Sequence, residues 1–324
     1  MTPNASAIES QARPPERLAP LYALCADREQ ETREIHPPND FYGNALALKS
    51  FLGLPGDYAV KAAMEHSAEL GHGVWMHNLE APLPAVLTMS PYRHAFIRER
   101  TDKPLYAVGP YVHYAPHALD EAGLAREKRR LGRNLLAFPA HSTHHVTCEH
   151  DAGRFGAVLR ELGREFDRVR VCVYWKDVLD GVALEYARQG FECVSCGHIY
   201  DPMFLPRLKS LLAVASMTAA NALTTALGYS VFMGVPHCYV PSMLGYSCRD
   251  EAMFASEVGA SHYREPSPDI AELEAAFREC SDAVTPRQHE AADRYWGFSS
   301  IRDRDGLSAL FRELEDMHAR GERS

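Results

Sequence analysis

Between residues 134 and 235, short apolar runs alternate with segments of helical periodicity, and this alternation restricts the fold more than any other feature of the chain. Strands are predicted at 134–139, 169–174, 191–194, 212–215 and 231–235. Helices are predicted at 153–166, 181–189, 203–211 and 221–227. Each apolar run has strand length and ends at turn residues, as buried parallel strands do. The pattern therefore predicts a doubly wound parallel sheet with right-handed crossovers.

A smaller set of similar runs precedes this region. Asn39 and Asp40 can cap a helix that extends to Leu52 and is closed by the Gly- and Pro-rich residues 53–56. Strand-length runs follow at 58–64, 85–89 and 105–108. Because 324 residues exceed the size at which one hydrophobic core usually keeps growing, two lobes are expected. The predicted fold is therefore α/β, with two Rossmann-like lobes.

The predicted organisation has four parts. They are a loose leader over 1–37, an N-terminal acceptor-side lobe over 38–125, a C-terminal nucleotide-sugar-binding lobe over 126–290 and a helical segment over 291–324. The first 20 residues are polar and Pro-rich, and they lack the basic start and apolar block of a signal peptide.

Composition and charge exclude several classes of protein. The chain has 34 Lys and Arg against 43 Asp and Glu, a net charge of −9, which argues against a nucleic-acid binder. Residues 211–248 contain no charged side chain, but their Gly, Pro, Ser and Thr residues are poorly suited to a membrane span. The eight cysteines are scattered and lie partly inside apolar runs, so reduced thiols and a cytoplasmic location are expected.

Polar and small residues follow the predicted strands of the second lobe. In a doubly wound sheet, ligands bind outside the carboxyl ends of the strands. That rule selects the stretches 141–145, 175–177, 197–201 and 216–221. We therefore predict a nucleotide-donor site made by His141, Ser142, Thr143, Tyr174, Lys176, Asp177, Gly197, His198, Ser216, Thr218 and Asn221.

Several polar residues of this predicted site have a structural role as the alternative to ligand binding. Ser142 and Thr143 precede a helical segment, where hydroxyls and backbone N–H groups can hold phosphate oxygens but can also simply cap the helix. The small residues 216–221 permit a ligand to approach closely, and they also suit tight packing of helix on sheet. Lys176 is a candidate cation for the leaving phosphate.

Four residues are candidates for a catalytic base. His66 and His72 follow a predicted strand of the first lobe, and a histidine that titrates near neutral pH can deprotonate an acceptor hydroxyl. Glu149 and Asp151 lie in the lobe expected to hold the donor. Transfer requires the donor and the base to lie on opposite sides of the cleft between the lobes. The two histidines of the first lobe are therefore favoured as the base. The histidines of the second lobe lack the spacing of a zinc site, so no metal is expected.

Several short motifs resemble a known family. Gly71-His72-Gly73, the run 87–93 that contains Ser90-Pro-Tyr-Arg93 and the run 108–114 that contains Gly109-Pro-Tyr111 resemble GT-B-type glycosyltransferases of bacterial surface-polymer synthesis, including teichoic-acid glycerophosphate polymerases. The resemblance implies an interlobe cleft, a C-terminal helix that crosses back to the first lobe, and a His-Gly histidine as acceptor base. Two histidines stand in this segment, so His66 and His72 both remain candidates.

The function expected from these features is that of a nucleotide-sugar-dependent glycosyltransferase of bacterial polysaccharide biosynthesis. The donor is a CMP-activated acidic sugar, such as Kdo or a sialic acid, or a UDP- or GDP-hexose, and the acceptor is a saccharide. We expect no cofactor, no nucleic-acid partner and at most peripheral association with a membrane. These features are compatible with a homo-oligomer. The alternatives are a sugar-nucleotide epimerase of the same fold and a non-catalytic nucleotide-binding scaffold.

Overall fold

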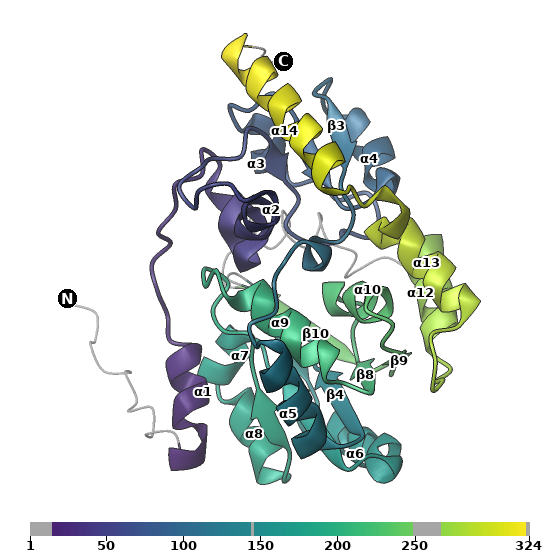
Figure 1. The fold of residues 1–324 in the computed structure, drawn as a ribbon. Coiled ribbons are helices and arrows are strands. Elements are labelled where there is room, and N and C mark those ends of the chain that lie inside the picture. The colour runs from purple at the N-terminus through teal and green to yellow at the C-terminus, as the bar shows by residue number, and fades with distance from the viewer. Residues whose placement is uncertain (1–14, 144–145, 249–266, 322–324) are drawn as a thin grey trace, which may run out of the picture.

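The computed structural model describes residues 15–143, 146–248 and 267–321, and two parallel sheets form two lobes in this part of the chain (Figure 1). The first sheet has the order β1-β2-β3, made of β1 (Ala63–Met64), β2 (Val86–Thr88) and β3 (Leu105–Ala107). Its strands are shorter than predicted, because residues 58–62 approach β1 without pairing. The first lobe nevertheless has the parallel sheet that the sequence predicts.

The second sheet has five strands in the order β7-β6-β4-β8-β9. These are β4 (Asn134–Phe138), β6 (Arg168–Cys172), β7 (Glu192–Val194), β8 (Met217–Ala220) and β9 (His237–Tyr239). Counted along the lobe, the order is 3-2-1-4-5, that of a Rossmann sheet, whose order reverses between β4 and β8. A separate antiparallel pair joins β5 (Val146–His150) to β10 (Leu244–Cys248).

Helices cover both sheets. In the N-terminal part they are η1 (Glu16–Leu18), α1 (Ala19–Leu24), η2 (Pro37–Gly43), α2 (Asn44–Leu52), α3 (Met76–Glu80), η3 (Pro91–Arg93), α4 (His94–Arg98) and η4 (Tyr111–His113). The middle part has α5 (Glu121–Leu131), α6 (Ala152–Leu162), η5 (Gly163–Glu165), α7 (Trp175–Leu179), α8 (Val182–Arg188), α9 (Phe204–Ala213) and α10 (Thr225–Phe232). The C-terminal part has α12 (Pro268–Phe277), α13 (Pro286–Trp296), η6 (Phe298–Ser300) and α14 (Arg304–Ala319).

Side-chain caps begin several of these helices. Asp120 accepts a hydrogen bond from the Gly123 N–H at the start of α5, and Thr285 forms a capping box with Gln288 at the start of α13. The predicted Asn39 cap is wrong, because α2 begins at Asn44 and Asn39 instead bonds to the backbone beside β1. A polar residue before an apolar run therefore caps a helix only when its side chain is not hydrogen-bonded to another part of the chain.

The strands predicted at 212–215 and 231–235 are wrong. The first run starts inside the last turn of α9, and the second run starts inside the last turn of α10. The strands β8 and β9 begin only after these runs. Leu205, Leu208 and Leu212 recur at helical spacing and are buried on one side of α9. A short apolar run cannot be assigned to strand or helix by its composition alone, which is the source of the error.

The C-terminal segment crosses back to the first lobe, as predicted. Helix α13 packs against α10 of the second lobe and also contacts η3 of the first, and α14 lies against α2 (Figure 1). The Tyr106 hydroxyl donates to Glu313 at 2.6 Å, and the Arg304 guanidinium donates to the Phe51 carbonyl at 2.7 Å. Together, the two lobes and the returning helix make a GT-B-like α/β fold.

The leader predicted over 1–37 is wrong for its described part. Leu18, Leu21 and Cys25 are buried in the core of the second lobe, and the Arg17 guanidinium donates to the Ala187 carbonyl at 2.9 Å. Residues 15–25 therefore pack onto that lobe and contribute to its core. Residues 1–14 lie outside the described part of the chain.

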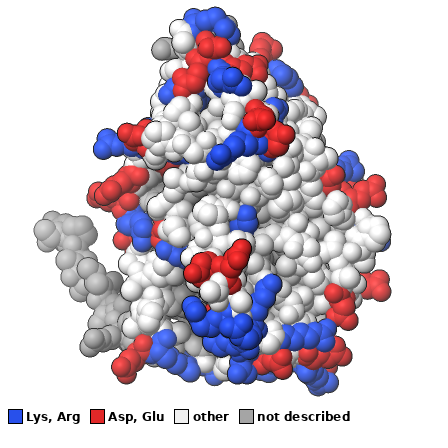
Figure 2. All heavy atoms as spheres, in the orientation of Figure 1, with Lys and Arg blue, Asp and Glu red and all other residues white. Residues whose placement is uncertain are grey.

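Charge is unevenly spread over the face drawn in Figure 2, where Lys and Arg gather over α5 and the surface over α10 carries few charges. Arg130 of α5 pairs with Glu127 and Glu192. Among the described helices, none is both long and apolar enough to cross a membrane.

Two cysteines form a disulfide, so the expectation of reduced thiols throughout is wrong for this pair. Cys238 of β9 bonds to Cys280, which follows α12, with their Cα atoms 4.8 Å apart. The other described cysteines are free thiols. The bond ties the last strand of the second sheet to the helices that return to the first lobe.

Replacing Cys280 with serine is expected to destabilise the oxidised protein by about 4 kcal/mol, the chain-entropy value for a loop of this length. The loop separates the two cysteines by 42 positions. Chemical unfolding with and without a reductant measures the effect, and Cys193→Ser, which removes a free thiol, is the matched control. A reductant that lowers the stability of Cys280→Ser as much as that of the wild type would contradict the prediction.

Candidate functional site

A cavity of about 210 Å³ lies between the lobes, at the carboxyl ends of strands from both sheets. Its second-lobe wall comes from residues that follow β4, β6, β7 and β8, so it opens where the order of the Rossmann sheet reverses. Its first-lobe wall is made by Tyr42, Asn44, His66, Ser67, Ala68, Glu69 and Trp75. The cavity therefore has the place that the sequence analysis predicts for a ligand.

His66 is the predicted base that reaches this cavity. It lies two residues beyond β1 in a loop that Arg93 holds in place. The Arg93 guanidinium donates from Nη2 to Oε1 of Glu65 at 2.8 Å, from Nε to Oε2 of Glu65 at 3.0 Å, and from Nη1 to the Gly71 carbonyl at 2.7 Å. Both partners of the ion pair are buried, with 2% and 3% of their side chains exposed. A buried, bidentate pair fixes the loop geometry.

The surroundings of His66 keep its imidazole neutral. The rings of Phe41, Tyr42 and Trp75 lie 5.4, 6.1 and 5.7 Å from it. Burial lowers the pKa of His66 to about 4, while nearby Glu69 acts in the opposite direction. Among the described residues, its buried Nδ1 has no hydrogen-bonding partner. A neutral imidazole with a free ring nitrogen can accept a proton from a ligand hydroxyl.

The other three predicted bases lie outside the cavity wall. His72 is exposed and its ring meets the edge of Phe96 at 5.0 Å. Asp151 caps α6 by accepting a hydrogen bond from the Arg154 N–H at 2.8 Å. Glu149 is an exposed residue of β5 that pairs with Gly245 of β10. The geometry therefore favours His66 within the predicted set.

The predicted donor loop after β4 is held in place by Ser142 of the loop and by Lys176 and Asp177 of α7. The Ser142 hydroxyl donates to Asp177 at 2.7 Å and accepts from the Cys148 N–H at 3.1 Å. The Lys176 ammonium donates to the Thr143 carbonyl at 2.8 Å. These three side chains shape the loop and do not line the cavity. Of its predicted residues 141–145, the last two lie outside the described part of the chain.

Three predicted donor residues do line the cavity, namely His141, Thr143 and Tyr174. The His141 and Tyr174 rings lie 4.4 Å apart. Gly197 and His198 lie beyond the wall, and His198 is fully buried beside Trp175 and 3.3 Å from Asp27. Asn221 follows β8 but uses its side chain to accept from the Ala140 N–H at 2.6 Å and to donate to Ser242 at 2.9 Å.

The assignment of Ser216 and Thr218 to this site is wrong. Ser216 precedes β8, and its hydroxyl accepts from the Asn134 N–H at the amino edge of the sheet. Thr218 lies within β8, fully buried, with its hydroxyl 2.8 Å from the Nδ1 of His237. Both therefore lie away from the carboxyl edge, because the strand begins five residues later than predicted.

The structure adds cavity residues that the sequence analysis missed. Thr224 and Thr225 stand at the N-terminus of α10, and Trp75 precedes α3. Among the described residues, the buried Thr224 Oγ1 and Trp75 Nε1 have no hydrogen-bonding partner. The paired threonines before an apolar helical run are a helix-start signal that could have identified this end of α10.

Charged groups are scarce in the wall. Among the described lining residues there is no Lys or Arg, and Glu69 is the sole carboxylate. In the described ranges, no three His, Cys, Asp or Glu side chains gather in a way that could hold a metal ion. Outside the wall, the Arg207 guanidinium pairs with Asp201 at 2.8 Å. Among the described lining residues, a bound anion would therefore meet backbone and hydroxyl groups and no cationic side chain.

Comparison with known proteins returns no matching family model and no similar curated protein. Solved structures do align with the chain. The wall teichoic acid polymerase TagF aligns with a TM-score of 0.40 and 11% identity, over 76% of this chain and 60% of that one. A UDP-glucosyltransferase from Polygonum tinctorium aligns with a TM-score of 0.35 and 16% identity, over 74% and 55%. This chain thus spans less than two thirds of the length of either structure.

Proposed function

We propose that this chain is a glycosyltransferase that moves a sugar from a nucleotide-activated donor to a saccharide acceptor. One observation carries the proposal. The cavity at the reversal point of a Rossmann sheet also contains a neutral histidine from the opposite lobe, with a ring nitrogen that no described residue engages. A donor held by one lobe thereby faces a proton acceptor held by the other, as group transfer requires.

The donor phosphate would lie at the N-terminus of α10. This helix has eight residues, and its N-cap Thr224 makes no side-chain capping bond. Its backbone N–H groups and the positive end of its dipole favour an anion, and the Thr224 hydroxyl supplies a further donor. Across the cavity, the Thr225 hydroxyl accepts from the Ala68 N–H at 3.4 Å, so this end of α10 already contacts the first lobe.

The acceptor would lie beside His66. Its imidazole removes the proton of the acceptor hydroxyl, whose oxygen forms a bond to the anomeric carbon as the bond from that carbon to the phosphate oxygen breaks. The nucleotide leaves with the electron pair, and the helix terminus stabilises the charge that develops on the phosphate. His141 and Tyr174 line the donor side and are available to contact the nucleoside or the sugar.

Nucleotide binding is the first test. We expect CMP, UDP, GDP, dTDP or CDP to raise the melting temperature, since a ligand at 100 times its Kd stabilises the native state by about 2.7 kcal/mol. Thr224→Val should weaken binding of that nucleotide by about tenfold or more, because a hydrogen bond to a charged group is lost. Thr147→Val, at an exposed position of β5, is the matched control. Unchanged affinity in Thr224→Val would contradict this placement of the phosphate.

A turnover assay without acceptor, together with the melting-temperature panel, separates the alternatives. Turnover of a nucleotide sugar without any acceptor would favour an epimerase, and failure of all five nucleotides to stabilise the chain would favour a scaffold. Repeating the measurement with a chelator tests the proposal that no metal takes part.

A further inference from the structure

Tyr42 has a backbone conformation that tyrosine rarely adopts. Its φ and ψ are 60° and 8°, in the left-handed region, and it is the one residue other than glycine with positive φ in the described ranges. A bulky side chain in this region costs on the order of 1–3 kcal/mol. Such a conformation persists only where the surroundings hold it from several sides.

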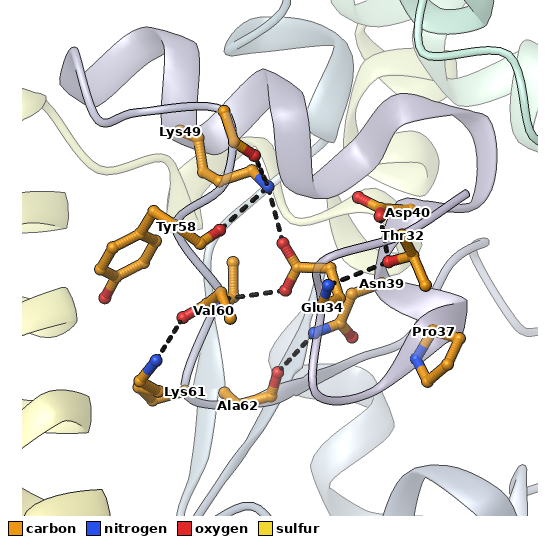
Figure 3. Close-up of polar contacts among 12 residues, drawn as sticks. Thr32, Glu34, Pro37, Asn39, Asp40, Lys49, Tyr58, Val60, Lys61 and Ala62 are labelled. Atoms are coloured by element: carbon orange, nitrogen blue, oxygen red, sulfur yellow. Dashed lines mark hydrogen bonds and ion pairs between the residues drawn. The ribbon is translucent and has the colours of Figure 1, made fainter. Parts of the chain in front are cut away.

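The first lobe holds the turn before Tyr42 through a buried polar network (Figure 3). The Asn39 side chain donates to the Ala62 carbonyl and accepts from the Met64 N–H, both at 2.9 Å, which ties the turn to β1. Thr32, which precedes the turn, donates to Asp40 of the turn, and its hydroxyl accepts from the Glu34 N–H at 2.9 Å. Glu34, two residues beyond Thr32, accepts from the Lys49 ammonium of α2 at 2.7 Å. The turn is therefore anchored to both the sheet and the first helix of its lobe.

The second lobe holds the same turn from the other side. The Tyr42 N–H donates to the Ile199 carbonyl at 2.7 Å, and its ring meets Phe204 edge-on at 4.8 Å. Gly43 follows with a φ of 74°, and a Cβ there would lie 2.5 Å from the Pro202 carbonyl oxygen. Only a glycine lets the backbone at position 43 come this close to Pro202. The turn therefore packs directly against the loop between β7 and α9.

The Tyr42 side chain also lies between the two halves of the candidate site. Its ring lies 6.1 Å from that of His66, on the acceptor side. Its hydroxyl lies 3.4 Å from that of Tyr174, whose ring lies against His141 on the donor side. One side chain thus lies beside the proposed base and contacts Tyr174, which lines the donor side of the cavity in the opposing lobe.

We propose that Tyr42 is a positioning residue, an interlobe pin that fixes His66 relative to the donor side of the cavity. The strained turn and its anchors hold the ring in place before substrate binds, so the distance between base and donor is set in advance. Misplacement of a reacting group by about 1 Å can cost on the order of 100-fold in rate, which gives such a pin its effect. The inference rests on the proposed role of His66.

The protonation of His66 reports on the pin without any substrate. Burial is the largest influence on the pKa of His66, followed by Glu69, which raises it, and by His77 and His36, which lower it. The Tyr42 ring is one of three aromatic rings that shield the imidazole. Removing the ring admits water, so the His66 pKa should rise from about 4 toward the ordinary histidine value of about 6.5.

The test compares Tyr42→Phe, Tyr42→Ala and Tyr42→Gly in the full chain. The His66 imidazole is followed by an NMR pH titration and assigned by its loss in His66→Ala. We expect wild-type titration in Tyr42→Phe and a raised pKa in the other two variants. Glycine should be more stable than alanine at position 42, because it adopts positive φ without strain. Melting curves establish that each variant is folded.

Turnover provides the second readout. Tyr42→Gly and Tyr42→Ala should lose on the order of 100-fold in kcat with little change in nucleotide affinity, and Tyr42→Phe should recover most of it. A folded Tyr42→Gly variant with either wild-type His66 titration or wild-type kcat would overturn the inference. If no donor supports transfer in the wild type, the proposed function fails, and an unchanged His66 titration in Tyr42→Gly would separately refute the pin.

Discussion

His66→Ala is expected to lower kcat by about 10²–10⁴ while nucleotide affinity stays close to that of the wild type. This range is the usual contribution of a positioned acid–base group. Affinity should persist because the proposed phosphate contacts come from α10 in the other lobe, whereas His66 lies on the acceptor side. Initial rates at saturating donor and acceptor, together with calorimetry for the nucleotide, measure the two quantities separately.

The matched control is His72→Ala, which removes an exposed imidazole from the same loop region and should leave kcat unchanged. Glu149→Ala and Asp151→Ala test the second lobe. If His66→Ala turned over normally while one of these acid variants lost activity with intact binding, the base would lie in the second lobe. Loss of activity in His72→Ala alone would return the assignment to the Gly-His-Gly motif.

The pH dependence of the rate follows from the same burial. Because burial lowers the pKa of His66 to about 4, its imidazole stays unprotonated, and able to accept a proton, throughout the neutral range. We therefore expect kcat/KM to fall only as the pH drops toward about 4. An acid limb centred near the ordinary histidine value of about 6.5 would contradict a buried base.

Lys49→Met is expected to destabilise the protein by about 3–5 kcal/mol, because it leaves the buried Glu34 carboxylate without its cation. Only 3% of the Lys49 side chain and none of the Glu34 carboxylate side chain is exposed. Lys49 also donates to the Gly56 and Tyr58 carbonyls, both at 3.0 Å, so two further acceptors lose a partner. Denaturant unfolding measures the change, provided that the slope stays that of the wild type.

Lys61→Met is the matched control, since Lys61 approaches Glu315 only at 3.9 Å and that partner is 42% exposed. Surface pairs of this kind contribute little. Adding Glu34→Gln to Lys49→Met should restore part of the stability, because the uncompensated charge is gone. Equal stability of Lys49→Met and Lys61→Met would contradict the prediction.

The direction in which pH changes the stability of Lys49→Met follows from the burial of Glu34. Burial already raises the pKa of Glu34 in the wild type, against the opposing effect of Lys49. Without the ammonium this pKa should rise further. A group with a raised folded-state pKa favours the native state when protonated, so the variant should recover stability as the pH falls and lose it as the pH rises.

Periodicity predicted the parts of the fold that local sequence controls. The strands β4, β6 and β7 lie within two residues of their predicted bounds, and the parallel arrangement follows from the helices between them. Prediction failed at β8 and β9, where apolar residues of the preceding helices were assigned to strands. Ser216 and Thr218 entered the predicted site through that error alone, because a shift of five residues moves them from one edge of the sheet to the other.

The sequence by itself determined the α/β class, the parallel sheet of the second lobe and the edge of that sheet where a ligand would bind, because these depend on the spacing of apolar and turn residues along the chain. Tertiary structure alone decided which polar groups face the cavity. Ser142 and Asp177 hydrogen-bond to each other, whereas Thr224 and Trp75 line the cavity with polar atoms that no described residue engages. The left-handed Tyr42 and the Cys238–Cys280 bond likewise depend on contacts between distant segments, which no local pattern encodes.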